Sequence, residues 1–134
     1  MALSADLLRG YTDTIILNQL VDTDNYGYEI TKRISDLSQG ALELKEATLY
    51  TAFRRMESSG YIISYWGNEG AGARRRYYSI TPTGRDRLAE DQAAWEETRR
   101  VLNMLLAAKR KDSPNSKSEH MEIPIIQVEV NKNE

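Results

Sequence analysis

Apolar and polar positions in the first half of the chain alternate as amphipathic helices require. Residues 4–21 begin at Ser4, a residue type typical of helix N-caps, and their second half is apolar on more than one side. Residues 26–37 and 46–59 each repeat apolar side chains at i, i+4 and i+7, the spacing of a helix with one buried face. Residues 42–44 alternate between apolar and polar, which predicts a short strand at most.

The second half of the chain predicts a β-hairpin and a long helix. Residues 61–66 and 75–80 are rich in β-branched and aromatic side chains, and the glycine-rich residues 67–72 join them. Thr81 followed by proline is typical of a helix start, with an N-cap and proline at the first helical position. The helix that follows extends over residues 82–111, which is more than twice the average length in globular proteins.

Three helices, a hairpin and a long helix, in this order, predict a winged helix-turn-helix arrangement in an α+β, mostly α, fold. We therefore expect a winged helix-turn-helix domain over residues 1–81 and a dimerisation helix over residues 82–111. Residues 112–134 have linker composition at their start and a β-prone run, Ile123–Val130, that Pro124 interrupts. They predict a polar, flexible tail whose apolar run would need a partner edge to form a strand.

Composition excludes several function classes. The chain has 134 residues, no cysteine and a single histidine, His120 in the predicted tail. A disulfide framework, a zinc site and a buried Ser-His-Asp triad are therefore not expected, and we predict neither a metal nor a cofactor nor an enzyme. No apolar run has membrane-spanning length, and the first residues do not resemble a signal peptide, so we expect a cytoplasmic protein.

Charge is distributed unevenly. The chain carries a net charge of −2, yet residues 45–87 hold eight basic and four acidic side chains. A basic middle segment in an acidic chain predicts a surface that faces a polyanion such as nucleic acid.

Five short motifs in one order carry a family resemblance. They are Tyr26-Gly27-Tyr28-Glu29-Ile30, Ala47-Thr48-Leu49-Tyr50, Glu57-Ser58-Ser59-Gly60-Tyr61-Ile62, Ser64-Tyr65-Trp66-Gly67, and Arg74-Arg75-Arg76-Tyr77-Tyr78-Ser79-Ile80-Thr81 with Gly84 after it. Together they resemble the PadR family of transcriptional regulators over roughly residues 7–106. The short chain with one terminal helix resembles its small subfamily, which includes the multidrug-sensing regulator LmrR. The resemblance implies a homodimeric repressor that binds a palindromic operator in double-stranded DNA and is released by a planar aromatic ligand.

The predicted third helix, residues 46–59, offers candidate DNA contacts. Thr48, Tyr50 and Thr51 lie off its apolar stripe, where the N-terminal half of a recognition helix would meet phosphates and base edges. The alternative is an ordinary solvated helix face, which explains an exposed tyrosine poorly. Arg54 lies on the same side, and the lysines Lys32 and Lys45 are either phosphate contacts or simple surface charges.

The hairpin offers a second set of candidate DNA contacts. Strand alternation directs Arg74 and Arg76 to one side and Arg75 to the other. Arginine suits phosphates and narrow minor grooves, whereas the alternative is a solubilising charge cluster. Tyr77 and Tyr78 point to opposite faces, so one is expected in the core and the other, taken as Tyr77, near the DNA backbone.

The long helix carries a seam with alternating spacings of four and three residues, which predicts a coiled-coil partner helix and hence a homodimer. The alternative is a helix that packs only on its own domain. The predicted seam consists of Leu88, Gln92, Trp95, Arg99, Leu102 and Leu106.

Trp95 in this seam is either a large core residue or a wall of a ligand pocket. The resemblance implies that Trp95 and its symmetry mate sandwich planar drugs. Arg99 stands where the family pattern has an acid, which favours acidic or neutral aromatic ligands. Asp13 would pair with a ligand cation or with Arg99. The full candidate set is Gly10, Asp13, Thr14, Leu17, Trp95, Arg99 and Leu102. A rival class is a small-molecule or protein-interaction module on the same scaffold without sequence-specific DNA binding.

Overall fold

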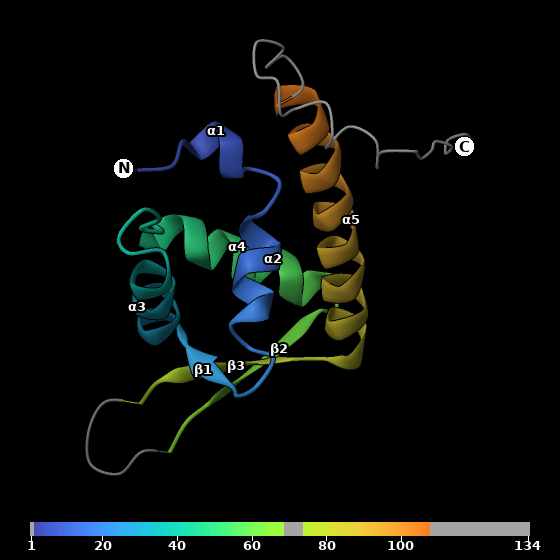
Figure 1. Cartoon of the computed structure of the whole chain (residues 1–134). Coiled ribbons are helices and arrows are strands. Elements are labelled where there is room, and N and C mark those ends of the chain that lie inside the picture. The colour runs from blue at the N-terminus through green and yellow to red at the C-terminus, as the bar shows by residue number, and fades with distance from the viewer. Residues whose placement is uncertain (1, 69–73, 108–134) are drawn as a thin grey trace. The chain divides into compact units, whose positions relative to one another are not determined.

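The computed structural model describes residues 2–68 and 74–107 (Figure 1). The chain divides into two compact units, residues 1–94 and 95–134. Helices dominate the described residues and accompany one small antiparallel sheet, which confirms the predicted fold class. The elements in chain order are α1 (Ala5–Leu8), α2 (Thr12–Asn18), β1 (Asn25–Tyr26), α3 (Gly27–Leu37), α4 (Glu46–Ser58), β2 (Ile62–Trp66), β3 (Arg76–Ile80) and α5 (Pro82–Ala107).

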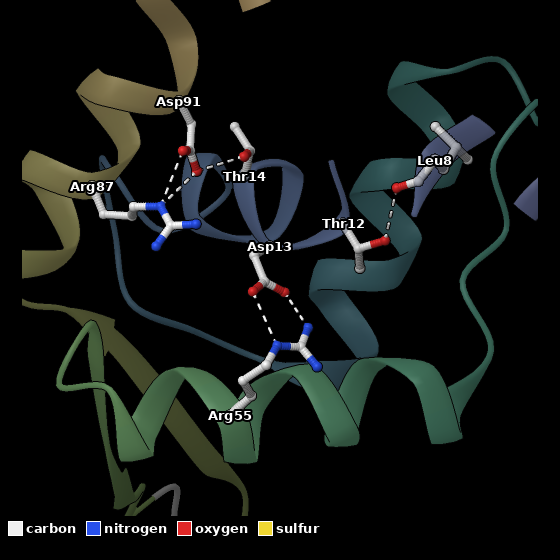
Figure 2. A network of polar contacts seen from close by, with 7 residues as sticks. All are labelled: Leu8, Thr12, Asp13, Thr14, Arg55, Arg87 and Asp91. Atoms are coloured by element: carbon white, nitrogen blue, oxygen red, sulfur yellow. Dashed lines mark hydrogen bonds and ion pairs between the residues drawn. The ribbon is translucent and has the colours of Figure 1, made fainter. Parts of the chain in front are cut away.

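The prediction of one continuous helix over residues 4–21 is wrong, because the helix is interrupted between α1 and α2. The predicted cap is present: the Ser4 hydroxyl accepts a hydrogen bond from the backbone N–H of Leu7 at 3.2 Å. Gly10 lies in the break, where its low helix propensity favours an interruption. Thr12 spans the break by donating its hydroxyl to the Leu8 carbonyl at 3.3 Å (Figure 2).

The core of the first unit lies among α2, α3, α4, the sheet and the start of α5. Phe53 of α4 stacks on Tyr78 of β3, with ring centroids 3.7 Å apart. Gly27 lets α3 approach α4 closely, since a Cβ there would lie 2.6 Å from the Tyr50 hydroxyl oxygen. The predicted apolar stripe of the third helix is confirmed as buried. The core side chains are Ile16, Leu17, Leu20, Ile30, Ile34, Leu49, Ala52, Phe53, Met56, Ile62, Tyr78, Ile80 and Leu88.

The sheet has three antiparallel strands in the order β1-β3-β2, so the predicted hairpin is confirmed. The short strand β1 was not predicted, because Asn25 follows polar residues and Tyr26 stands at the predicted helix start; both pair with β3. No strand forms at residues 42–44, which lie in the loop before α4. Leu37 also departs from the predicted buried face, since 71% of it is exposed at the end of α3.

The start of α5 follows the predicted chemistry. The Thr81 hydroxyl accepts a hydrogen bond from the Gly84 N–H at 2.9 Å and donates one to the Gly60 carbonyl at 2.7 Å. Gly60 itself has φ +81°, a conformation that favours glycine after a helix. The predicted helix end at residue 111, the centre of the glycine-rich turn, His120 and the apolar run of the tail lie outside the described residues. None of the helices that the structure describes is long and apolar enough to cross a membrane.

Candidate nucleic-acid interface

The outer face of α4 presents polar side chains because its opposite face is fixed in the core. Thr48, Tyr50, Thr51 and Arg54 are all exposed, as predicted for this side of the helix. Arg54 Nη2 donates to the Thr51 hydroxyl at 3.3 Å. The Tyr50 ring meets Phe53 edge-on at a centroid distance of 5.5 Å, which anchors its base while 36% of the residue stays exposed. The helix therefore offers hydroxyls and a guanidinium to an approaching ligand.

The two candidate lysines differ in their surroundings. Lys45 occupies the N-cap position of α4 and is exposed. Lys32 on α3 lies 3.4 Å from the Asp36 carboxylate, which raises the pKa of its ammonium group. Both lysines stay exposed, but the charge of Lys32 is partly balanced by its neighbour.

A chain of hydrogen bonds joins α4 to the wing, the name used here for β2, β3 and their connection. The Ser64 hydroxyl of β2 donates to the Glu57 carboxylate of α4 at 2.6 Å. Arg76 Nε of β3 donates to the same hydroxyl oxygen at 3.1 Å. Ser64 thus fixes the wing to the helix that carries the candidate DNA contacts.

The wing arginines, Arg74, Arg75 and Arg76, alternate as predicted. Arg74 and Arg76 share one face, where their guanidinium carbons lie 5.2 and 5.5 Å from the ring centroid of Trp66. Arg75 turns to the other face and lies 4.6 Å from the ring centroid of Tyr26. All three arginines are exposed, and each lies over an aromatic ring.

The face of the sheet that carries Arg75 also carries a row of tyrosines. Tyr26, Tyr77 and Tyr65 are direct cross-strand partners, and Tyr77 contacts Tyr26 edge-on at 5.5 Å and Tyr65 in a stacked pair at 5.8 Å. The Tyr65 hydroxyl donates to the Asp24 carboxylate at 2.5 Å. This hydrogen bond is the main reason why the pKa of Tyr65 is raised to about 12. Tyr78 occupies the core and Tyr77 lies half-buried on the opposite face of β3, which confirms that the two tyrosines point to opposite faces.

An ion pair joins α2 to α4. Both carboxylate oxygens of Asp13 accept hydrogen bonds from the Arg55 guanidinium, and the Nε contact measures 3.2 Å (Figure 2). The hydrogen bond to Asp13 raises the pKa of Arg55. Asp13 is therefore engaged by Arg55 within the first unit. In the second unit, Arg99 Nη2 lies 2.6 Å from Glu96 Oε1.

A second polar network joins α2 to the first turns of α5. The Thr14 hydroxyl donates to Asp91 at 2.8 Å, and Arg87 Nε contacts both oxygens of the same carboxylate at 3.0 and 3.2 Å (Figure 2). Arg87 Nη1 also donates to the Tyr61 hydroxyl at 2.9 Å. Thr14 is thus engaged within its own chain.

The predicted ligand-binding residues of the first unit fall in different environments. Gly10, Asp13 and Thr14 line an open groove of about 1020 Å³ between α1, α2, the loop before α4 and the start of α4. Thr48 and Thr51 line the same groove. Leu17 is fully buried in the core.

The predicted seam of α5 divides at the boundary between the units. Leu88 is 5% exposed and belongs to the core of its own chain, which removes it from the seam. Gln92 Nε2 donates to Asn18 at 3.2 Å. In the second unit Trp95, Leu102 and Leu106 are exposed to 41%, 44% and 79%. Among the described residues no group of three or more acidic or histidine side chains could hold a metal ion.

Comparison with known proteins agrees with this geometry. Residues 16–90 match the model of the transcriptional regulator PadR-like family. The transcriptional regulator Rv3488 of Mycobacterium tuberculosis is 34% identical over 87 residues, which cover 65% of this chain and 78% of that protein.

Two solved structures are similar along nearly their whole length. A transcriptional regulator from Clostridium thermocellum has a TM-score of 0.68 and 48% identity, covering 73% of this chain and 95% of that one. A PadR family transcription regulator from Clostridium difficile R20291 has a TM-score of 0.65 and 41% identity, covering 72% and 99%. The fold is thus that of PadR-type winged-helix transcriptional regulators. The chain belongs to the transcriptional regulator PadR-like family.

Sequence reasoning missed the partners that hold the candidate site together. Trp66 was not predicted to take part, although Arg74 and Arg76 both lie over it. Its pairing with Arg76 depends on the hairpin register, which a long glycine-rich connection leaves open. The contact between Asp13 and Arg55 joins residues 42 positions apart, and no local pattern signals it.

Proposed function

We propose that the chain is a cytoplasmic homodimeric transcriptional repressor that binds a palindromic operator in double-stranded DNA. The observation that carries the proposal is the joined surface of α4 and the wing. Exposed hydroxyls and a guanidinium lie on α4, three arginines lie on the wing, and Ser64 connects the two elements. Family membership supports DNA as the partner of this surface.

In this proposal α4 enters the major groove and the wing follows the adjacent backbone or minor groove. Tyr50, Thr51 and Thr48 contact base edges and phosphates from the first turns of α4, and Arg54 adds a phosphate contact. The wing arginines, with Tyr77, Lys45 and Lys32, supply further backbone contacts. Such contacts release counterions, so affinity should fall steeply as the salt concentration rises.

The homodimer is proposed to form through the second unit. Its described helix exposes Trp95, Leu102, Leu105 and Leu106. Apolar side chains exposed to water are unfavourable, and burial against a partner helix would remove this cost. A second copy with the same seam would cover these side chains and place two α4 helices on the two halves of an operator.

Release by a ligand is proposed from the resemblance to the small multidrug-sensing subfamily of LmrR type. Trp95 would stack on a planar aromatic compound at the dimer interface, with Arg99 and Leu102 beside it. Arg99 favours an acidic or neutral compound, and binding would change the spacing of the two α4 helices.

Fluorescence anisotropy with the DNA upstream of the protein's own gene tests the function, with a scrambled duplex as control and a salt series for each. Each of Arg74→Gln, Arg75→Gln and Arg76→Gln should weaken binding and reduce the slope of log affinity against log salt by about one. Arg9→Gln is the matched control, because Arg9 is an exposed arginine directly after α1 that pairs with Asp6. Its slope should equal that of the wild type.

Equal weak binding to both duplexes, with no effect of the wing substitutions, would contradict the proposal. The rival function, a small-molecule or protein-interaction module, would then be favoured. The open groove beside α2 would be its first candidate site.

A further inference from the structure

We propose that Trp66 is a positioning residue of the wing, which holds Arg74 and Arg76 in place for DNA phosphates. The inference rests on the proposed function, because it names a role within the same DNA-binding surface. Trp66 ends β2, and 52% of it is exposed. An indole with this exposure is not explained by core packing.

The register of the hairpin places both guanidinium groups on this one ring. Trp66 is the direct cross-strand partner of Arg76, and Arg74, two residues earlier, shares the face of Arg76. Their guanidinium carbons lie 5.5 and 5.2 Å from the ring centroid, within the range of cation–π attraction. Ser64 holds Arg76 from the neighbouring cross-strand position by a 3.1 Å hydrogen bond.

Such a contact restricts the flexible arginine side chains before DNA binds. A free arginine side chain loses rotamer freedom when it binds a phosphate, and that loss weakens binding. The attraction between a cation and the ring quadrupole restricts the side chain without consuming its N–H donors. Trp66 also lets two like charges stay close together on one strand face, where they otherwise repel each other.

The position of this face relative to α4 fits the proposed role. Ser64 and Arg76 lie on the same face of the sheet as Trp66, and Ser64 donates to Glu57 of α4. Arg74 and Arg76 are therefore held on the side of the wing that is bonded to α4. Arg75 lies on the opposite face over Tyr26, so its position does not depend on Trp66.

A double-mutant cycle on operator binding separates positioning from direct contact. Trp66→Leu should reduce the affinity of the otherwise wild-type protein about fivefold to tenfold, because two arginine side chains must then lose their rotamer freedom on binding. In the background Arg74→Gln/Arg76→Gln the same substitution should change affinity less than about twofold, because nothing remains to be positioned. Trp66→Phe should restore most of the affinity, since a phenyl ring keeps the cation–π attraction.

The control variant is Ile63→Ala, which removes an exposed apolar side chain from the opposite face of the same strand. It should leave operator affinity unchanged. Ring-current shifts of the Arg74 and Arg76 guanidinium resonances, measured by NMR without DNA, should be present in the wild type and absent in Trp66→Leu.

Two outcomes would overturn the inference. An equal loss in both backgrounds would mean that Trp66 contacts DNA itself or only stabilises the hairpin. Wild-type affinity in Trp66→Leu would mean that the stacked arginines are not held for binding. If the wild type binds no operator, the proposed function fails first, and intact ring-current shifts would then assign Trp66 a structural role only.

Discussion

At the residue scale, Tyr65 shows how a single hydrogen bond changes an ionisation. Its hydroxyl donates to Asp24, and the pKa of Tyr65 rises from 10.0 to about 12 because ionisation would break that bond and set two negative charges side by side. The group therefore contributes stability that is fully present below pH 10 and is lost as the pH rises towards 12.

We predict that Asp24→Asn lowers the pKa of Tyr65 back towards its usual value. Tyrosinate absorbance in a pH titration measures this, with Tyr65→Phe used to assign the transition by subtraction. Asp22→Asn, a change of the same charge at an exposed neighbouring carboxylate, should leave the titration as in the wild type. If Asp24→Asn leaves the pKa of Tyr65 unchanged, the hydrogen bond between the two side chains is not formed in solution.

At the element scale, the ion pair between Asp13 and Arg55 connects α2 with α4. The two side chains are exposed to 28% and 53%, so water screens their attraction. We predict that Asp13→Asn lowers the free energy of unfolding by about 1 kcal/mol or less. Urea denaturation at low and high salt measures the loss, which should shrink as salt is added.

Asp6→Asn is the matched control for this prediction. Asp6 pairs with Arg9 one turn away within the N-terminal segment, and both side chains are largely exposed. Removal of the Asp6 charge should leave the free energy of unfolding almost unchanged. If Asp13→Asn lowers the free energy of unfolding by more than predicted, and salt does not change the effect, packing around the pair rather than its charge holds α2 against α4.

At the scale of the whole molecule, the apolar seam of the second unit predicts the assembly. Leu102→Lys/Leu106→Lys places two charges on exposed apolar positions, and in a coiled-coil seam these would be buried without partners. We predict that this variant is a monomer while the wild type is a dimer, as light scattering after gel filtration would show. Operator affinity should fall with dimer loss, since only one half-site is then bound.

Leu37→Lys provides the comparison, because Leu37 is 71% exposed on α3 in the first unit. It should keep the wild-type mass. A monomeric wild type, or a dimeric seam variant, would contradict the proposed interface.

The sequence by itself determined the elements whose signals are local. The apolar stripe of α4, the cap at Thr81, the hairpin and the alternation of the wing arginines all follow from side-chain spacing within one element. These features were predicted because a helix period, a strand period and a cap depend on residues a few positions apart.

Only the tertiary structure decided which side chains meet across elements. Strand β1 exists because β3 pairs with it, and the stacking of Arg74 and Arg76 on Trp66 needs the hairpin register. The pairing of Asp13 with Arg55 depends on how α2 lies against α4. Such contacts join distant parts of the chain, and the spacing of side chains within one element shows which face is buried but not which residue of another element it meets.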